Sequence, residues 1–193
     1  TAAEGASGDR NENEDRAHIA AALSLQRTPP RPPPPPPTPS TSMGTLGLVA
    51  PLALVAATAF ASAALYVSAV EHPSRSALTD DEALHQWKPS YRRAAKFQGV
   101  LALAAAGLGC FLFTSTGDRR WAAGAAAAVA NWPFTLLAIR PTNVRLLAAG
   151  RGSSTTFMLL RRWGRLHAAR VALGWAAVAA YALALSRTRV RRD

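Results

Sequence analysis

Four short groups of residues in this chain combine types that can move protons and hold charge. They are Glu71–Arg75, Trp87–Arg93, Asn131–Pro133 together with Arg140–Asn143, and Trp163–Arg170. The last group is the most informative, because Trp163, His167 and Arg170 are spaced so that they share one face of a helix. A histidine can act as a general base, and a nearby arginine can stabilise a developing negative charge. The shared face therefore predicts a functional site where the last apolar segment begins.

Each of these residues also has a structural explanation that the sequence leaves open. Arg170 lies about one turn inside the apolar boundary, where an arginine can reach the membrane surface beside an aromatic-belt residue such as Trp163. Asn131 would serve equally as a hydrogen-bonding contact between helices, and Pro133 predicts a kink close to it. His72 is the second candidate for the base, although the proline after it disfavours a helix at His72.

Apolar segments separate these groups and predict the fold. They cover residues 44–70, 94–113, 121–139 and 166–185. At ~1.5 Å per residue, residues 44–70 comfortably exceed a hydrocarbon core of ~30 Å, and the other three segments are about as long as that core. Gly and Ala are frequent in all of them, as close packing of helices in lipid requires. The sequence therefore predicts an all-α integral membrane protein, a four-helix bundle formed by residues 43–193.

Residues 1–42 have a different composition. They hold 9 of the 14 prolines and 5 of the 11 acidic residues of the chain. Such a segment buries too little apolar surface to offset its chain entropy, so a disordered N-terminal tail is predicted. Met43 directly precedes the first apolar segment and is a candidate for the true start of the protein.

The basic residues are unevenly distributed around the predicted spans. An even number of spans places the connections 71–96 and 140–165 on one face of the membrane, and they carry 11 Lys and Arg. The opposite face carries 6, not counting the tail. The positive-inside rule therefore predicts that these long loops are cytoplasmic. Because the charges alternate with long apolar segments, membrane lipid is the expected partner and nucleic acid is not.

Several kinds of chemistry lack their usual residues. The sequence has no glycine-rich phosphate or dinucleotide motif and no His-Glu-x-x-His zinc motif. Cys110 is the single cysteine, and the histidines show no metal-ligand spacing. We therefore predict no metal site.

The ordered set of polar groups resembles the anthrone oxygenase-like family of small four-span membrane proteins. The resemblance extends from about Met43 to Leu185 and leaves residues 1–42 without a counterpart. The residues that carry it are Glu71-His72-Pro73-Ser74-Arg75, Trp87-Lys88-Pro89-Ser90-Tyr91-Arg92-Arg93, Asn131-Trp132-Pro133-Phe134-Thr135, Pro141-Thr142-Asn143 and Trp163-Gly164-Arg165-Leu166-His167-Ala168-Ala169-Arg170.

This resemblance implies an enzyme that oxidises an anthrone to an anthraquinone with O₂ and without a cofactor. The substrate would be a small hydrophobic aromatic. For that chemistry we predict His167 as the base with His72 as its rival, and Arg170 as the group that stabilises the oxyanion. The predicted substrate-binding residues are Asn131, Tyr91, Trp163, Arg75 and Asn143.

Two other classes of function remain open at this point. One is a membrane protein that binds a lipid or a quinone without catalysis. The other is a structural or assembly subunit, in which Arg170 and Asn131 only fix the packing of helices.

Overall fold

The structure is a computed structural model that describes residues 41–190. Residues 1–40 and 191–193 lie outside the described residues. The predicted disorder of the N-terminal tail therefore stays a prediction, apart from its last two residues, which already belong to the first helix.

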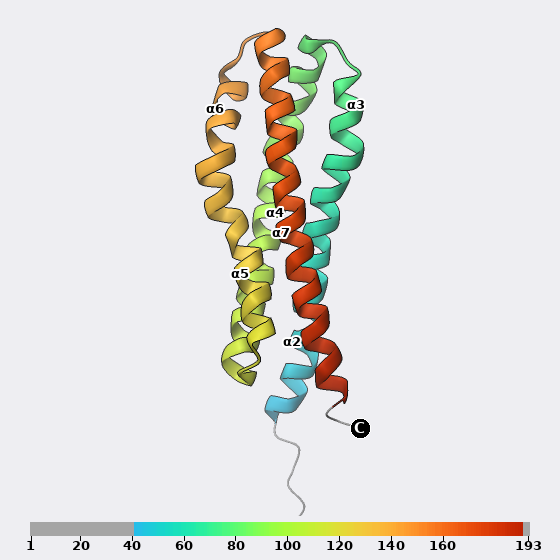
Figure 1. Ribbon diagram of the computed structural model, residues 1–193, viewed down its shortest axis with the longest axis vertical. Helices are drawn as coiled ribbons and strands as arrows, with labels where there is room; N and C mark the ends of the chain where they lie inside the picture. Colours follow the sequence, from blue (N-terminus) through green and yellow to red (C-terminus); the bar gives the residue numbers. More distant parts are fainter. Residues whose placement is uncertain (1–40, 191–193) are drawn as a thin grey trace, which may run out of the picture. The chain divides into compact units, whose positions relative to one another are not determined.

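Four long helical segments run up and down as an antiparallel bundle (Figure 1). In chain order they comprise α2 (Thr41–Tyr66), η1 (Val67–Glu71) and α3 (His72–Ser76); α4 (Asp80–Thr116); α5 (Arg119–Phe134), η2 (Thr135–Ile139) and α6 (Arg140–Ala148); and α7 (Ser154–Val190). All 4 segments are long and apolar enough to cross a membrane. The predicted all-α membrane bundle is confirmed.

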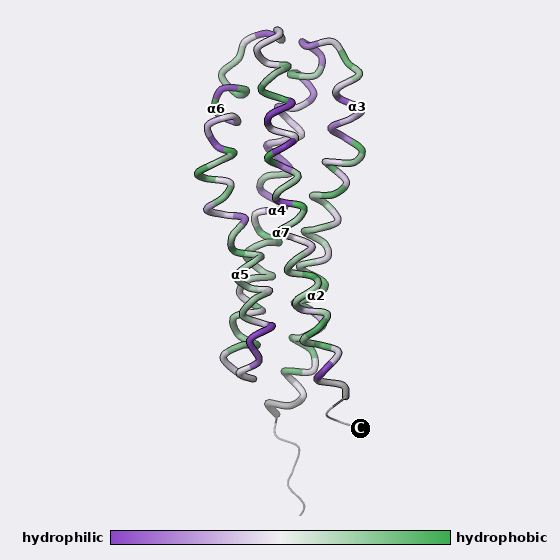
Figure 2. Tube along the Cα trace, in the orientation of Figure 1, coloured by the Kyte–Doolittle hydropathy of each residue, from purple (hydrophilic) through white to green (hydrophobic). Residues whose placement is uncertain are grey.

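The two ends of the bundle differ in composition (Figure 2). The site end, as we name it, holds α3, α6 and the first halves of α4 and α7, and many of the hydrophilic residues gather there. The alanine end holds the first half of α2, the connection between α4 and α5, and the last part of α7. Residues 71–96 and 140–165 both belong to the site end, as the even number of spans predicted.

Both stretches were predicted to be loops, and the structure shows that this prediction is wrong. They are mostly helical, and only residues 77–79 and 149–153 connect the helices at this end. Helix α4 begins with a capping box, in which the Thr79 backbone N–H donates to Glu82 Oε2 at 3.0 Å and the Glu82 N–H donates to Thr79 Oγ1 at 3.4 Å. The reason is that the apolar pattern shows where a segment leaves the lipid. It does not show where the helix ends, which depends on the capping residues.

Two prolines are accommodated by widened, π-helical turns. The His72 N–H donates to the Val67 carbonyl across η1, directly before Pro73, and the Arg140 N–H donates to the Thr135 carbonyl across η2, directly before Pro141. The expectation that Pro73 disfavours a helix at His72 is wrong, since that residue has helical φ and ψ of -68° and -44°. A widened turn leaves space for the proline ring where a regular turn would clash.

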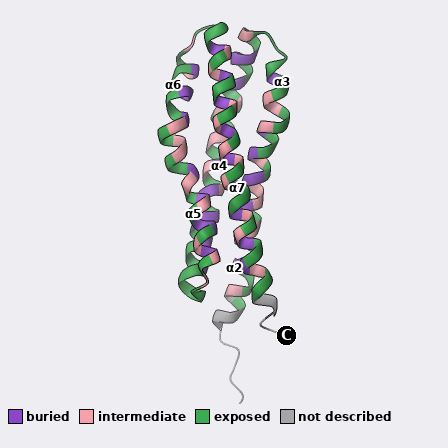
Figure 3. Cartoon of the chain, viewed as in Figure 1, coloured by how far each residue is buried: buried purple, intermediate pink, exposed green. Residues whose placement is uncertain are grey.

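Small side chains bring the helices together at the alanine end. The core there consists largely of alanines, among them Ala53, Ala57 and Ala105. Tyr181 of α7 fills the space left by two glycines, because a Cβ atom on Gly109 or Gly124 would lie 2.0 or 2.2 Å from the tyrosine side chain. The Tyr181 hydroxyl donates to the Ala105 carbonyl at 2.7 Å. Figure 3 shows that buried residues face the inside of the bundle along its length.

Candidate active site

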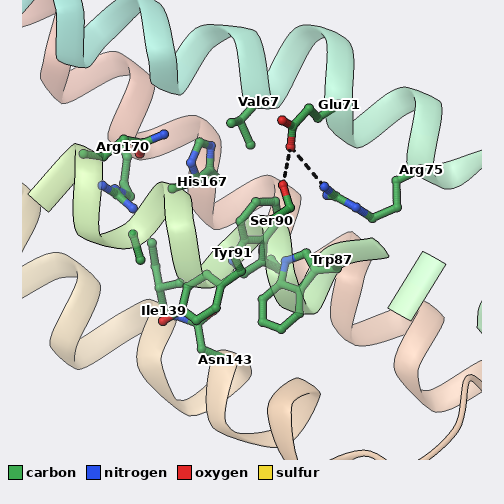
Figure 4. Close-up of a pocket in the computed structure, with 14 residues that line it drawn as sticks. Val67, Glu71, Arg75, Trp87, Ser90, Tyr91, Ile139, Asn143, His167 and Arg170 are labelled. Carbon is green, nitrogen blue, oxygen red and sulfur yellow. Dashed lines mark hydrogen bonds and ion pairs between the residues drawn. The ribbon is translucent and has the colours of Figure 1, made fainter. Parts of the chain in front are cut away.

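All of the predicted site residues except His72 line two adjoining cavities. The first, which we call the inner cavity, is lined by Val67, Glu71, Arg75, Trp87, Ser90, Tyr91, Ala94, Ala95, Gln98, Ile139, Asn143, Trp163, His167 and Arg170 (Figure 4). The second, the lipid-side cavity, is lined by Tyr91, Ala95, Gly99, Ala102, Asn131, Trp132, Thr135, Leu136 and Arg170. Tyr91, Ala95 and Arg170 belong to both, so the cavities share a wall. Both widened turns also contribute to these linings, as π-helical turns often do at functional sites.

His167 is held on two sides. It lies on α7 and is 3% exposed. Its Nδ1 lies 2.9 Å from Ser68 Oγ of η1, and its ring stacks on Trp163, one turn earlier, with 4.8 Å between the ring centroids. The described residues offer no hydrogen bond to Nε2. One ring nitrogen is therefore fixed, and the other is available to a ligand in the inner cavity.

Arg170 is a buried cation without a counter-ion among the described residues. It is 8% exposed, and its guanidinium lies 5.6 Å from the centre of the Phe60 ring. Its Nε atom has no hydrogen-bond partner, and none of the ion pairs within residues 41–190 includes it. Figure 4 shows that it lies beside His167. This burial argues against an arginine that merely reaches the membrane surface, and it leaves a positive charge free to meet an anion.

Arg75, by contrast, is already bound by protein groups. Its Nη2 donates to Glu71 Oε2 at 3.2 Å, and its Nε donates to Gln86 Oε1. Ser90 of α4 donates to the same Glu71 oxygen at 2.9 Å. The Arg75 guanidinium also lies 5.8 Å from the centre of the Trp163 ring. Its charge is thus largely neutralised, and its predicted contact with substrate is less direct than that of Arg170.

Tyr91 and Asn143 form a polar contact across the inner cavity. Asn143 Nδ2 donates to the Tyr91 hydroxyl at 2.9 Å, whereas Asn143 Oδ1 has no partner. Tyr91 stacks on Trp87 with 4.7 Å between centroids and 7° between planes. Since the hydroxyl oxygen accepts from Asn143, its own hydrogen can still be donated to a ligand.

Trp163, which the sequence also explained as an aromatic-belt residue, is a core residue instead, and so are Trp87 and Trp121. Trp87, Trp121 and Trp163 are 0%, 0% and 4% exposed. At the site end, Trp163 meets the edge of Trp87 with 5.9 Å between centroids. At the site end, α4 and α7 extend well beyond the apolar segments, so Trp87 and Trp163 lie inside the bundle rather than at its surface.

His72 does not join His167 and Arg170 at either cavity. It lines a separate small pocket with Arg75 and Phe157, and its ring centroid lies 5.9 Å from that of Trp163. Its imidazole packs against α7 at Gly164, where a Cβ atom would lie 2.2 Å from His72 Nε2. This placement makes His72 the weaker of the two predicted bases.

Asn131 faces the lipid-side cavity from α5. It is 2% exposed, and its Nδ2 donates to the carbonyls of Ala127 and Ala128, each at 3.3 Å. Its Oδ1 has no partner. The side chain therefore makes no bond to a neighbouring helix within the described residues, in contrast to the structural explanation offered from the sequence.

Several site residues were not predicted. Ser68, Ser90, Gln86 and Gln98 touch the predicted residues or line the inner cavity. Small hydroxyl and amide side chains give no periodic signal in a sequence, and their partners lie on other helices. Within residues 41–190, no group of three His, Cys, Asp or Glu side chains could hold a metal ion.

A comparison with protein families finds one match. Residues 87–180 match the family model of anthrone oxygenase. No curated protein and no solved structure matches the chain. The matched stretch runs from α4 into α7. It includes the residues of these helices, and of the helical segment between them, that line the two cavities, but not Ser68, Glu71 or Arg75 of the first helical segment. The match confirms the resemblance in the sequence: this membrane-spanning four-helix chain contains an anthrone oxygenase-like region.

Proposed function

We propose that this protein binds a small, flat, hydrophobic aromatic of the anthrone type and oxidises it with O₂ to a quinone, without a metal or organic cofactor. The observation that carries the proposal is the pairing of His167 with Arg170, a buried cation that lacks a counter-ion, at one cavity. The family match supports the same class of reaction. Membrane lipid surrounds the protein and delivers the substrate, and nucleic acid has no part in it.

His167 is the general base of the proposed reaction. An anthrone methylene is acidic because its carbanion is delocalised into an enolate that resembles a phenolate. In the required tautomer, His167 Nδ1–H donates to Ser68 Oγ, and Nε2 keeps the lone pair that removes the proton. Stacking on Trp163 holds the ring in place, which contributes orientation before the reaction begins.

Arg170 and Tyr91 stabilise the enolate oxygen. The guanidinium has unused donors and sits in a site of low polarity, where its attraction for a developing oxyanion is larger than in water. Tyr91 lines both cavities together with Arg170, and its hydroxyl group can donate to the same oxygen. The negative charge of the enolate oxygen would then develop next to the positive charge of Arg170.

Oxygen completes the reaction without further protein groups. The carbanion carbon forms a bond to O₂, and the peroxide takes up the proton that His167 removed. Loss of water from the resulting hydroperoxide breaks the O–O bond and the remaining C–H bond. One methylene and one O₂ thereby give one carbonyl and one water, so that the substrate is oxidised and O₂ is reduced.

Oxygen uptake by the purified protein tests this proposal. The detergent-solubilised protein is mixed with anthrone, and O₂ consumption is followed together with the absorbance of anthraquinone. His167→Gln is expected to lower the rate by roughly 10²–10⁴-fold. The matched control is His85→Gln, which changes an exposed histidine of α4 whose side chain is 73% accessible, and it should keep the full rate.

Other outcomes separate the classes of function. A wild-type protein that binds anthraquinone but consumes no O₂ would support a non-catalytic quinone-binding protein. If His167→Gln keeps the full rate, the assignment of the base is wrong. If it changes only the unfolding temperature of a protein without turnover, the structural class is favoured.

We also propose that the site end faces the cytoplasm. The connections and helix ends there carry 11 Lys and Arg against 6 at the other end of the predicted spans. Ser76→Cys and Ser153→Cys, each in a Cys110→Ser background, should both be protected in intact cells from a maleimide that cannot cross membranes. Labelling of both from outside would reverse the orientation.

A further inference from the structure

The lipid-side cavity is set apart from the inner cavity by its depth in the membrane. Apart from the shared wall, its residues belong to stretches 97–117 and 121–139, which contain no charged residue. Its volume is about 120 Å³, compared with about 20 Å³ for the inner cavity. A dry cavity of roughly 150 Å³ can hold a benzene molecule. The lipid-side cavity is therefore close to the size of a single aromatic ring.

The outer wall of this cavity is formed by side chains that face lipid. Trp132 and Leu136 both line it and are 40% and 53% exposed. Across from them on α4, Gly99 has no side chain, and a Cβ atom built there would meet only the Trp132 ring at 3.8 Å. A lateral opening between α4 and the α5–η2 segment thus needs only movement of side chains that already border the bilayer.

The inner wall holds an acceptor that lacks a donor. Asn131 is 2% exposed, both hydrogen bonds of its side chain use Nδ2, and its Oδ1 is buried without a partner among the described residues. Buried side-chain acceptors are usually satisfied, and an exception calls for an explanation. At this depth a lipid chain cannot supply the donor, whereas a hydroxyl group on an aromatic ring can.

We propose that the lipid-side cavity is a binding subsite that takes a hydroxylated aromatic ring laterally from the bilayer and accepts a hydrogen bond from its hydroxyl group at Asn131 Oδ1. Trp132 and Leu136 form the lid of this opening. Tyr91 and Arg170, in the wall shared with the inner cavity, direct the remaining rings toward His167. This last step rests on the proposed function, but the binding of the ring does not.

The first test uses two ligands that differ by one hydroxyl group. 2-Hydroxyanthraquinone and unsubstituted anthraquinone are titrated into the protein in lipid nanodiscs, and binding is followed by ligand absorbance. Asn131→Leu should weaken binding of the hydroxylated ligand about 10-fold, since one neutral hydrogen bond is lost. It should change binding of the parent ligand by less than about 2-fold. Equal effects on both ligands would overturn the role of Asn131.

The second test does not depend on changes at Asn131. Leu136→Cys and Leu137→Cys are prepared in a Cys110→Ser background and treated with a lipid-soluble maleimide. Leu137 is the matched control, because it is the next residue, is 79% exposed and does not line the cavity. Both cysteines should react, and 2-hydroxyanthraquinone should slow the reaction at position 136 about 10-fold while leaving position 137 unchanged.

The outcomes of the second test are separable. Equal protection of both positions, or of neither, would overturn the lateral subsite. Equal protection by a fatty acid would mean that the cavity takes lipid, attracted by Arg170, and would overturn the proposed ligand. Selective protection in a protein that never consumes O₂ would leave the subsite standing and refute only the proposed oxidation.

Discussion

At the alanine end, helices meet through Ala53, Ala57 and Ala105, and the Tyr181 hydroxyl there has a defined acceptor at 2.7 Å. At the site end, the same four helices bury arginine, histidine, asparagine and glutamine side chains between them. Within the described residues, the buried side-chain atoms without a partner at this end are His72 Nδ1, Arg75 Nη1, Trp87 Nε1, Asn143 Oδ1 and Arg170 Nε, and Asn131 Oδ1 of α5 is another. Trp121 Nε1 is the comparable atom toward the alanine end.

This difference indicates where the bundle gains stability and where it retains reactive groups. Close contact between small side chains lets helices associate in lipid without polar groups. A buried donor or acceptor that lacks a partner is unfavourable by roughly 1–3 kcal/mol. Such atoms at the site end persist although they oppose folding, which is expected where function requires unsatisfied groups. The close packing at the alanine end offsets the unfavourable free energy of these atoms.

The difference between the alanine end and the site end is tested most strongly at Arg170. Arg170→Met replaces an unpaired buried charge with an apolar side chain of similar length. Turnover of anthrone should fall by roughly 10²–10³-fold, the usual effect of losing a group that stabilises an oxyanion. The free energy of unfolding should rise by about 1 kcal/mol or more, because the buried charge is removed. Oxygen uptake and thermal unfolding in detergent measure the two effects.

Arg165→Met provides the control for that experiment. Arg165 lies on the same helix but is exposed, so neither turnover nor stability should change much. A variant Arg170→Met that unfolds at a lower temperature than the wild type would show that Arg170 supports the fold, and the contrast between the two ends would then fail.

A smaller effect is expected from overpacking the alanine end. In Gly109→Ala, the new Cβ atom would lie 2.0 Å from the Tyr181 hydroxyl oxygen. The tyrosine must shift and lose its contact with Ala105, which should lower the free energy of unfolding by roughly 1–3 kcal/mol. Gly107→Ala is the matched control, since nothing lies within 4 Å of a Cβ atom there. Equal unfolding temperatures for the two variants would contradict the packing described.

Much of the fold could be predicted from the sequence, because lipid imposes a simple rule on it. A long apolar segment that crosses the membrane satisfies its backbone hydrogen bonds by forming a helix, and residues 44–70 and 121–139 are such segments. Outside lipid that rule does not apply, so the helical nature of residues 80–89 and 154–162 was missed. The sequence nevertheless contains a signal for the start of α4, because Thr79 and Glu82, three residues later, form a capping box.

The even number of spans predicts that the polar groups lie at one end of the bundle, but the sequence specifies their arrangement only along single helices. The spacing of Trp163, His167 and Arg170 fixes one helix face, and these residues do line the inner cavity. Contacts between helices depend on rotation and depth, which no local pattern specifies. Ser68 and His167 are 99 positions apart, so their contact could not be inferred. His72 was placed at the correct end of the bundle, but its packing at Gly164 was not foreseeable.

A matched pair of tyrosines compares the two ends directly. Tyr181→Phe should lower the free energy of unfolding by about 1 kcal/mol through loss of its hydrogen bond to Ala105, and leave turnover unchanged. Tyr91→Phe should lower turnover about 10-fold, since a donor to the enolate oxygen is lost, with little change in stability. Unfolding temperature and oxygen uptake are measured for both. If both variants changed turnover and unfolding temperature to the same extent, the two ends would not differ in function.

The smallest effect is expected at Ser68, which acts on the reaction only through His167. Its Oγ lies 2.9 Å from His167 Nδ1, and that bond selects the tautomer in which Nε2 is unprotonated. Ser68→Ala should lower kcat roughly 5-fold, the equivalent of about 1 kcal/mol. The KM for anthrone should stay close to its wild-type value, because Ser68 does not line either cavity. Ser68→Thr retains the hydroxyl group and should restore most of the rate. Steady-state oxygen uptake gives both constants, and an equal loss of rate in the alanine and threonine variants would show that packing at η1, rather than the hydrogen bond, supports the base.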